Sequence, residues 1–226
     1  GGEWKEVSWN VALDYVAHAL KDIAREHGGD ALAALAAQSS TLEEFYLLGK
    51  VMQGLGSKNA DFRPRQSDFS ADALRAGAPW LGMRLTEIEQ LDAALVVGSF
   101  LRKDHPLIAQ RLRQAAKKFT KVSLLSVSGD DPLINLHARL TVAPTRLAAT
   151  LAAIVKGAAE LKGSALPDGL EDISVCETSK KIAQSLVDGE KRAVFLGNVA
   201  TQSSDATQLH ALALELVKLT GATVGF

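Results

Sequence analysis

The chain has 226 residues, and 25 Lys and Arg residues nearly balance 26 Asp and Glu residues, which leaves a formal charge of −1. A chain this close to neutral has no long-range field to attract nucleic acid or an anionic membrane surface, so it excludes both as partners. The length allows two domains with cores that need no metal or disulfide. The single cysteine, Cys176, has no disulfide partner, no CxxC spacing and no base beside it in sequence. This predicts a structural thiol in a reducing compartment.

No run of 18 apolar residues is present, which predicts a soluble chain. The first residues, Gly-Gly-Glu-Trp-Lys, resemble neither a signal peptide nor a natural start. We therefore expect the chain to be a piece of a longer protein, whose remaining parts can carry chemistry that this piece lacks.

The first third of the chain predicts two amphipathic helices around a short strand. Ser8 can cap a helix that ends near His27, and the apolar stretch 31–37 favours a buried strand. Thr41 opens a Thr-x-x-Glu capping box, which starts a second helix that continues to about Leu55. The expected buried stripes are Ala12, Leu13, Val16, Leu20, Ile23 and Ala24 on the first helix, and Leu42, Phe45, Leu48, Val51, Met52 and Leu55 on the second.

An irregular stretch at 57–87 is followed by the pattern of strand, helix and strand. The continuous apolar run 91–98 suits an interior parallel strand, and Pro106 suits the first turn of a helix that ends near Phe119. With a strand at 121–127, this favours a right-handed βαβ unit within a doubly wound module near residues 76–160. Further predicted elements are a strand at 139–142, a helix at 146–161, a linker at 163–169, a helix at 179–187, a strand at 193–196 and a helix at 204–220.

Two predicted strands end in glycine and turn toward a helix, which is where α/β folds bind phosphates through free backbone N–H groups. These turns are Gly98-Ser99 and Gly197-Asn198. Neither belongs to a G-x-G-x-x-G or a Walker pattern, so a structural turn is favoured over a phosphate site. His105 stands at a helix start just past the first turn, whereas the five histidines together show no metal-ligand spacing. The sequence predicts no metal ligands and no catalytic residues.

The polar loop 59–69 is the other candidate for function, because binding residues often lie on irregular segments. Its two arginines, Arg63 and Arg65, can bind an anionic cofactor or a carboxylate of a partner surface. Asp61 and Asp68 are equally placed to pair with them, so internal or interfacial pairing is favoured.

Several phrases resemble the molybdopterin-dependent oxidoreductase family: 4–13, the strand 94–98 leading to His105-Pro106, and 219–222. The loop 59–69 is similar to the version in the large iron–sulfur subunit of bacterial NADH-quinone oxidoreductase (respiratory complex I). The resemblance spans nearly the whole chain. It implies an α/β fold of two doubly wound parallel-sheet modules, similar to domains 2 and 3 of formate dehydrogenase and DMSO reductase, with the second module inserted into the first. The implied division is a discontinuous domain at 1–75 plus 165–226 and an inserted Rossmann-like module at 76–164.

The chain departs from the cofactor-using members of this family at their anchoring motifs. Their Gly-x-Asn corresponds to Gly98-Ser99-Phe100, their Asp-Pro-Arg to Ser126-Val127-Ser128, and their Pro-Gly-Thr-Asp to 144–147. Near the loop, Ser67 is only a weak equivalent of the molybdenum ligand. The resemblance therefore implies a vestigial cleft without a cofactor. Its candidate residues are Gly98, Ser99, His105, Gly197 and Asn198, with Arg63, Arg65 and Ser67 from the loop.

The function implied by the resemblance is a non-catalytic scaffold in the NADH-oxidising peripheral arm of complex I. Its partners would be other peripheral-arm subunits, at the cytoplasmic face of the bacterial inner membrane. The whole subunit would carry iron–sulfur clusters N-terminal to this chain. Two alternatives remain open: a cofactor-binding piece of a molybdopterin-dependent oxidoreductase, and the central domain of a thiamine-diphosphate enzyme.

Overall fold

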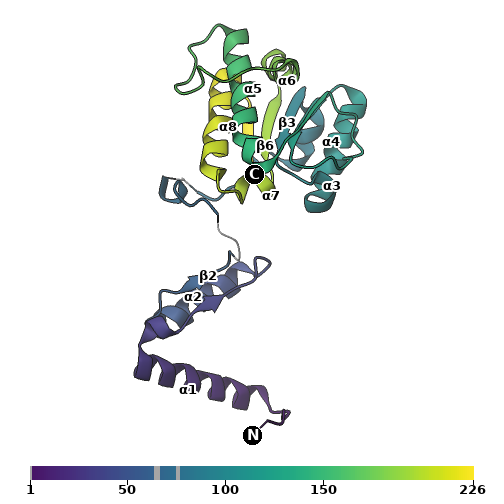
Figure 1. Cartoon of the computed structure of the whole chain (residues 1–226). Helices are drawn as coiled ribbons and strands as arrows, with labels where there is room; N and C mark the ends of the chain where they lie inside the picture. Colours follow the sequence, from purple (N-terminus) through teal and green to yellow (C-terminus); the bar gives the residue numbers. More distant parts are fainter. Residues whose placement is uncertain (1, 64–66, 75–76) are drawn as a thin grey trace. The chain divides into compact units, whose positions relative to one another are not determined.

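The structure, a computed structural model, describes residues 2–63, 67–74 and 77–226, which belong to two compact units (Figure 1). The N-terminal unit comprises residues 1–66 and the C-terminal unit residues 67–226. Both contain parallel sheets flanked by helices, so the predicted α/β class with parallel sheets is confirmed. The elements of the N-terminal unit are α1 (Trp9–His27), the 3₁₀ helix η1 (Gly29–Ala31), β1 (Ala34–Leu35), α2 (Leu42–Gly54) and β2 (Ala60–Asp61).

Local capping signals set both helix starts in the N-terminal unit. The side chain of Ser8 accepts a hydrogen bond from the Val11 amide at 3.5 Å, as predicted for α1. The capping box of α2 is also confirmed: the Thr41 hydroxyl accepts from the Glu44 amide at 3.2 Å, and the Glu44 carboxylate accepts from the Thr41 amide at 2.8 Å. Both caps satisfy amides that the first turn of a helix leaves without partners.

The apolar stripe of α1 differs from its expected burial. No residue of α1 is buried, and Leu13 is 59% exposed. On α2, Met52 is buried and the Phe45 ring meets the Phe62 ring edge to face. The predicted strand at 31–37 shortens to two residues because η1 takes its first part, and it pairs in parallel with β2, which lies in a stretch expected to be irregular. Within the described residues, α1 packs mainly against η1.

The C-terminal unit is built on one five-stranded parallel sheet in the order β5-β4-β3-β6-β7. Three helices cover one face, and α4 with a 3₁₀ segment covers the other (Figure 1). Its elements are η2 (Asp72–Leu74), η3 (Leu85–Gln90), β3 (Ala93–Val97), α3 (Leu101–Asp104), α4 (Pro106–Lys118), β4 (Lys121–Ser126), β5 (Ala138–Thr141), η4 (Pro144–Arg146), α5 (Leu147–Lys162), α6 (Glu177–Asp188), β6 (Arg192–Leu196), α7 (Asn198–Thr201), α8 (Ala206–Thr220) and β7 (Thr223–Gly225).

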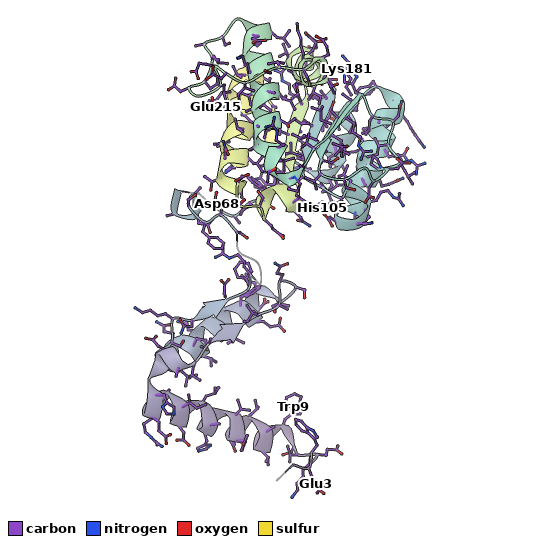
Figure 2. All side chains as sticks on the ribbon, viewed as in Figure 1. Glu3, Trp9, Asp68, His105, Lys181 and Glu215 are labelled. Carbon is purple, nitrogen blue, oxygen red and sulfur yellow. The ribbon has the colours of Figure 1, made fainter. Side chains whose placement is uncertain are left out.

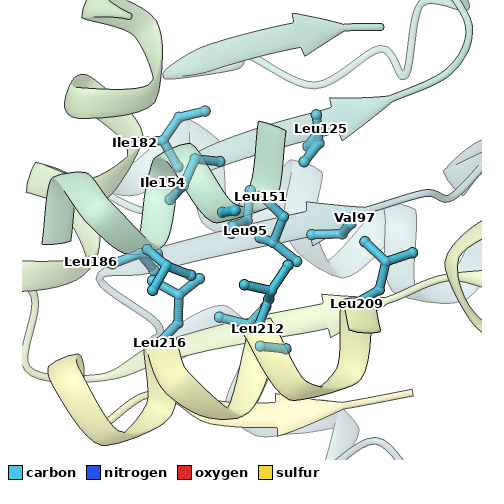
Figure 3. Packing of buried hydrophobic residues seen from close by; sticks show 14 of the residues in the cluster. Leu95, Val97, Leu125, Leu151, Ile154, Ile182, Leu186, Leu209, Leu212 and Leu216 are labelled. Carbon is cyan, nitrogen blue, oxygen red and sulfur yellow. The ribbon is translucent and has the colours of Figure 1, made fainter. Parts of the chain in front are cut away.

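The central strand β3 is buried on both faces, which explains its uninterrupted apolar sequence. Leu95 and Val97 point into the larger core, which they share with α5, α6 and α8 (Figure 3). Ala94 and Val96, which alternate with them, point into the smaller core beneath α4. Alternation along a strand thus divides one apolar run between two cores.

Strand pairing in the C-terminal unit differs from the expected division of the chain. Residues 165–226 were expected to share a sheet with 1–75, but β6 pairs with β3 over five residues and β7 extends the same sheet. The stretch 163–169, expected to separate two domains, only connects α5 to α6. These helices pack on one face of the sheet, where a Cβ added to Gly157 would lie 3.4 Å from the Cβ of Ala183. Small residues allow this close packing, so β6 returns beside β3.

Candidate functional site

The candidate site lies at the carboxyl ends of the strands, where β3 and β6 are neighbours. From β3 the chain proceeds to β4 on one side, whereas β6 lies on the other side. In open α/β sheets, ligands bind outside the carboxyl ends at such a reversal of strand order. The sequence placed Gly98 and Ser99 after β3 and Gly197 and Asn198 after β6, and the structure brings these two turns together.

The turn after β3 is bonded to the chain that follows β6. Gly98 has φ +62°, its amide donates to the Leu125 carbonyl at 2.8 Å, and its carbonyl accepts from the Val199 amide at 2.9 Å. A Cβ added to Gly98 would lie 2.7 Å from the Ala200 nitrogen. The start of α7 therefore covers this turn, and the Val199 amide is bonded to it.

The turn after β6 is closed in the same way. The Gly197 amide donates to the Val97 carbonyl at 2.8 Å, and a Cβ on Gly197 would lie 2.3 Å from the Cβ of Ser99. The remaining crevice has a volume of about 30 Å³ and is lined by Ser99, Gly197 and His105, the last of which Figure 2 labels. That volume is enough to hold a water molecule.

Ser99 contributes a hydroxyl group to the lining of this crevice. It is 7% exposed, and its Oγ has no hydrogen-bond partner in the described residues. A single water can satisfy such a group. The crevice alone is much smaller than ligand pockets, which have volumes of about 300–1,000 Å³. The space between these two turns is therefore too small for the pterin of the cofactor-using family members.

A second cavity, of about 120 Å³, lies beside the ends of β3 and β4 and is lined by three cationic side chains. The Arg139 guanidinium donates to the Ser128 carbonyl at 2.6 Å, and Arg102 donates to the Asp131 carbonyl at 3.0 Å. Lys103 lies 3.5 Å from the Asp130 carboxylate. These cations hold the loop after β4.

In the loop 59–69, Arg63 pairs internally, as favoured from the sequence. Its Nε lies 3.5 Å from the Asp61 carboxylate, and its guanidinium lies over the Phe62 ring. The amides of Arg63 and Phe62 also donate to Asp61 and hold the pKa of that carboxyl below its usual value. Arg65 lies outside the described residues. Ser67 is the first residue of the C-terminal unit.

Asp68 has a structural role that the sequence did not indicate (Figure 2). Its carboxylate accepts from the Thr207 amide at 2.9 Å, in the first turn of α8, and from the Ser70 hydroxyl at 2.5 Å. The hydroxyls of Ser70 and Thr207, followed by their amides, hold the pKa of Asp68 well below its usual value. Asp68 thus caps α8, whose own N-cap residue, Asp205, makes no capping bond.

We predict that Asp68→Asn lowers the melting temperature at pH 7 more than Asp205→Asn, because both remove one negative charge near the same helix end but only Asp68 binds its amides. The folded pKa of Asp68 is depressed, so its stabilisation is present above the ordinary value of 3.8 and is lost as the pH falls through the folded pKa. Thermal melts from pH 7 to pH 2.5 should show the gap between the variants narrowing below about pH 4. A gap independent of pH would contradict this assignment.

Cys176 is the N-cap of α6, where its sulfur lies 3.2 Å from the Ser179 hydroxyl. The Ser179 hydroxyl, and then its amide, lower the pKa of the thiol. In the described ranges no three His, Cys, Asp or Glu side chains gather as metal ligands, and no helix is long and apolar enough to cross a membrane. The thiol is therefore assigned to helix capping.

The C-terminal unit is therefore a doubly wound α/β domain. At the carboxyl ends of β3 and β6, the two turns are bonded to each other and pack closely. The sequence matches the molybdopterin oxidoreductase family model over residues 1–225, and the chain belongs to that family. This membership sets aside the thiamine-diphosphate alternative.

Among curated relatives, the chain is 36% identical over 122 residues to "Putative formate dehydrogenase SH0748" of Staphylococcus haemolyticus (strain JCSC1435) and 31% identical over 121 residues to "Probable oxidoreductase YjgC" of Bacillus subtilis (strain 168). Each match covers 52% of this chain but 12% of the relative. Acetylene hydratase from Pelobacter acetylenicus shares the fold, with a TM-score of 0.63 and 17% identity over 98% of this chain and 34% of that one. The chain thus corresponds to a small part of larger proteins.

Proposed function

We propose that this chain is the scaffold region of the large iron–sulfur subunit of a bacterial NADH-quinone oxidoreductase. In this role it carries no cofactor, contacts other subunits of the NADH-oxidising peripheral arm, and supports a cluster-bearing region elsewhere in the same polypeptide. The complex would lie at the cytoplasmic face of the inner membrane and carry electrons from NADH to quinone.

The observation that carries this proposal is the filled switch point. Gly197 meets Ser99, and the amides of Gly98, Gly197 and Val199 are bonded to backbone carbonyls of the same sheet end. Buried amides released from these bonds would cost free energy unless a ligand replaced every one. The resemblance of the loop 59–69 to the large iron–sulfur subunit of complex I supports the same assignment from an independent segment.

The test is elemental and pterin analysis of the full-length protein that contains this chain, purified from its native membrane. We expect iron in several atoms per chain, molybdenum and pterin well below one per chain, and co-purification with an NADH-oxidising subunit. Iron serves as the internal control, since its loss would reveal damaged protein. One molybdenum and pterin per chain, without an NADH-oxidising partner, would overturn the proposal.

A second candidate has a specific observation in its favour, because the curated relatives at 31–36% identity include proteins named as putative formate dehydrogenases. In that case the chain is one part of a molybdopterin-dependent oxidoreductase. The same preparation distinguishes the two functions: formate-dependent dye reduction together with molybdenum supports this candidate, and NADH-dependent quinone reduction supports the first.

A further inference from the structure

Helix α4 presents a row of cations on the side of the C-terminal unit that it covers (Figure 1). The stretch 105–129, which includes this helix, contains no Asp or Glu but five cationic side chains: Arg111, Arg113, Lys117, Lys118 and Lys121. The whole chain has a formal charge of −1, so these five cations leave −6 on all other residues. The charge of this nearly neutral chain is therefore strongly uneven.

Glu89 of η3 neutralises part of this charge. Its carboxylate lies 2.6 Å from the Arg111 guanidinium and 3.6 Å from the Lys118 ammonium. Asp104 and Asp130, which flank the stretch in sequence, bind groups at α3. Within the described residues, the other three cations make no ion pair, so a surplus of positive charge remains on this side of the sheet.

These three cations, Arg113, Lys117 and Lys121, are here named the α4 cation row. All three are exposed, and Arg113 and Lys117 lie one helical turn apart, since side chains four positions apart share one face of a helix. Cations in the last turn stabilise a helix through its dipole, which accounts for Lys117. The dipole does not account for Arg113 in the middle of α4 or for Lys121 in β4.

Two large apolar side chains flank the row. Leu107 is 74% exposed in the first turn of α4, and Phe119 is 58% exposed at its C-cap. Aromatic and arginine side chains are enriched where proteins meet. Nucleic acid or an anionic bilayer would extend beyond α4, which is about 20 Å long, and would meet the −6 of the remaining residues. A short acidic segment of a protein can meet the cations alone.

From this charge distribution we propose that the outward face of α4 is a docking surface for an acidic helix of a neighbouring protein subunit. Carboxylates three or four positions apart on such a helix match the spacing of Arg113 and Lys117. Complementary charges speed association and fix the orientation of the partner, so binding should weaken as salt screens them. The inference rests on the proposed scaffold function, which it deepens by naming a contact surface and the chemistry of the partner.

The test is the double variant Arg113→Glu/Lys117→Glu in the full-length protein, with retention of the peripheral-arm subunits during purification as the readout. At about 50 mM NaCl, retention should fall about tenfold, because attraction to the carboxylates becomes repulsion. Wild-type retention should itself fall as NaCl is raised to about 500 mM, whereas the variant should show little dependence on salt. The charge-conserving variant Arg113→Lys/Lys117→Arg should retain the subunits as the wild type does.

The matched control is Lys162→Glu/Lys180→Glu, which changes the charge by the same amount at two exposed lysines of α5 and α6. Lys162 lies in the last turn of its helix, as Lys117 does, so the two double variants should lose similar stability. The control should leave retention unchanged.

Three results would contradict the proposal. Retention lost equally by both double variants, or by neither, would overturn the docking surface and leave the scaffold function standing. Binding of the wild type, but not of Arg113→Glu/Lys117→Glu, to a DNA duplex or to phosphatidylserine vesicles would overturn the assignment of a protein partner. Absence of partner subunits from the wild-type preparation would instead overturn the scaffold function, and the docking surface with it.

Discussion

Replacing Gly98 with alanine should lower the free energy of unfolding of the C-terminal unit by about 2–5 kcal/mol, because two separate costs add. The first is backbone strain, since Gly98 has φ +62° and an L-residue there costs about 1–2 kcal/mol. The second is steric, because the new Cβ would lie 2.7 Å from the Ala200 nitrogen and must displace the start of α7, at about 1–3 kcal/mol. Urea unfolding followed by circular dichroism, with hydrogen exchange of the β3 amides, measures the loss.

Gly163→Ala is the matched control for this variant. Gly163 closes α5 with φ +61°, and no atom lies within 4 Å of an added Cβ. It should therefore cost only the backbone strain, about 1–2 kcal/mol. The difference between the two variants measures how tightly the switch point is filled. Equal costs would mean that the ends of β3 and β6 leave open space, which would weaken the case against a bound pterin.

Helix starts and buried strands could be predicted from the sequence, because neighbouring residues determine them. Ser8, Thr41 and Pro106 mark helix starts within a few residues, because each satisfies or lacks an amide in the first turn. The apolar runs that became β3 and β6 were recognisable since both faces of these strands are buried. Gly221 closes α8 in the left-handed conformation for the same local reason.

Contacts between distant residues were beyond local reasoning. Asp68 caps a helix whose first turn contains Thr207, which lies 139 positions later, and no spacing rule connects them. The close approach of Gly197 to Ser99 likewise follows from the pairing of β3 with β6, which no local motif indicates. The division of the chain depended on the partner of β6, and an apolar strand alone does not specify which neighbour it joins.

The stripe on α1 shows a related limit. Its helical spacing indicated which side of the helix is apolar, yet Leu13 on that side is 59% exposed. The spacing of apolar residues shows which face of a helix is apolar, but it does not show which element packs against that face. The same separation holds at the candidate site, where the glycine turns lie at the strand ends as expected and their packing decides what they can bind.

Leu151→Ala should lower the free energy of unfolding of the C-terminal unit by about 3–5 kcal/mol. Leu151 is 0% exposed in the middle of α5, within the larger core (Figure 3), and truncation removes apolar burial and leaves a cavity. Leu214→Ala is the matched control, because Leu214 lies on α8 and is 39% exposed, and it should cost less than about 1 kcal/mol. Urea unfolding of both variants measures the difference.

The size of this difference bears on function as well as on folding. A domain of ordinary stability unfolds at a cost of about 5–15 kcal/mol, so Leu151→Ala would remove a large part of it. A scaffold must keep its surfaces fixed, and helix α5 packs on the sheet of the C-terminal unit. Leu151→Ala should therefore also weaken retention of partner subunits as the temperature rises toward its lowered melting point, whereas Leu214→Ala should retain them over the same range. Equal temperature profiles for these two variants would mean that the stability of this core does not limit retention.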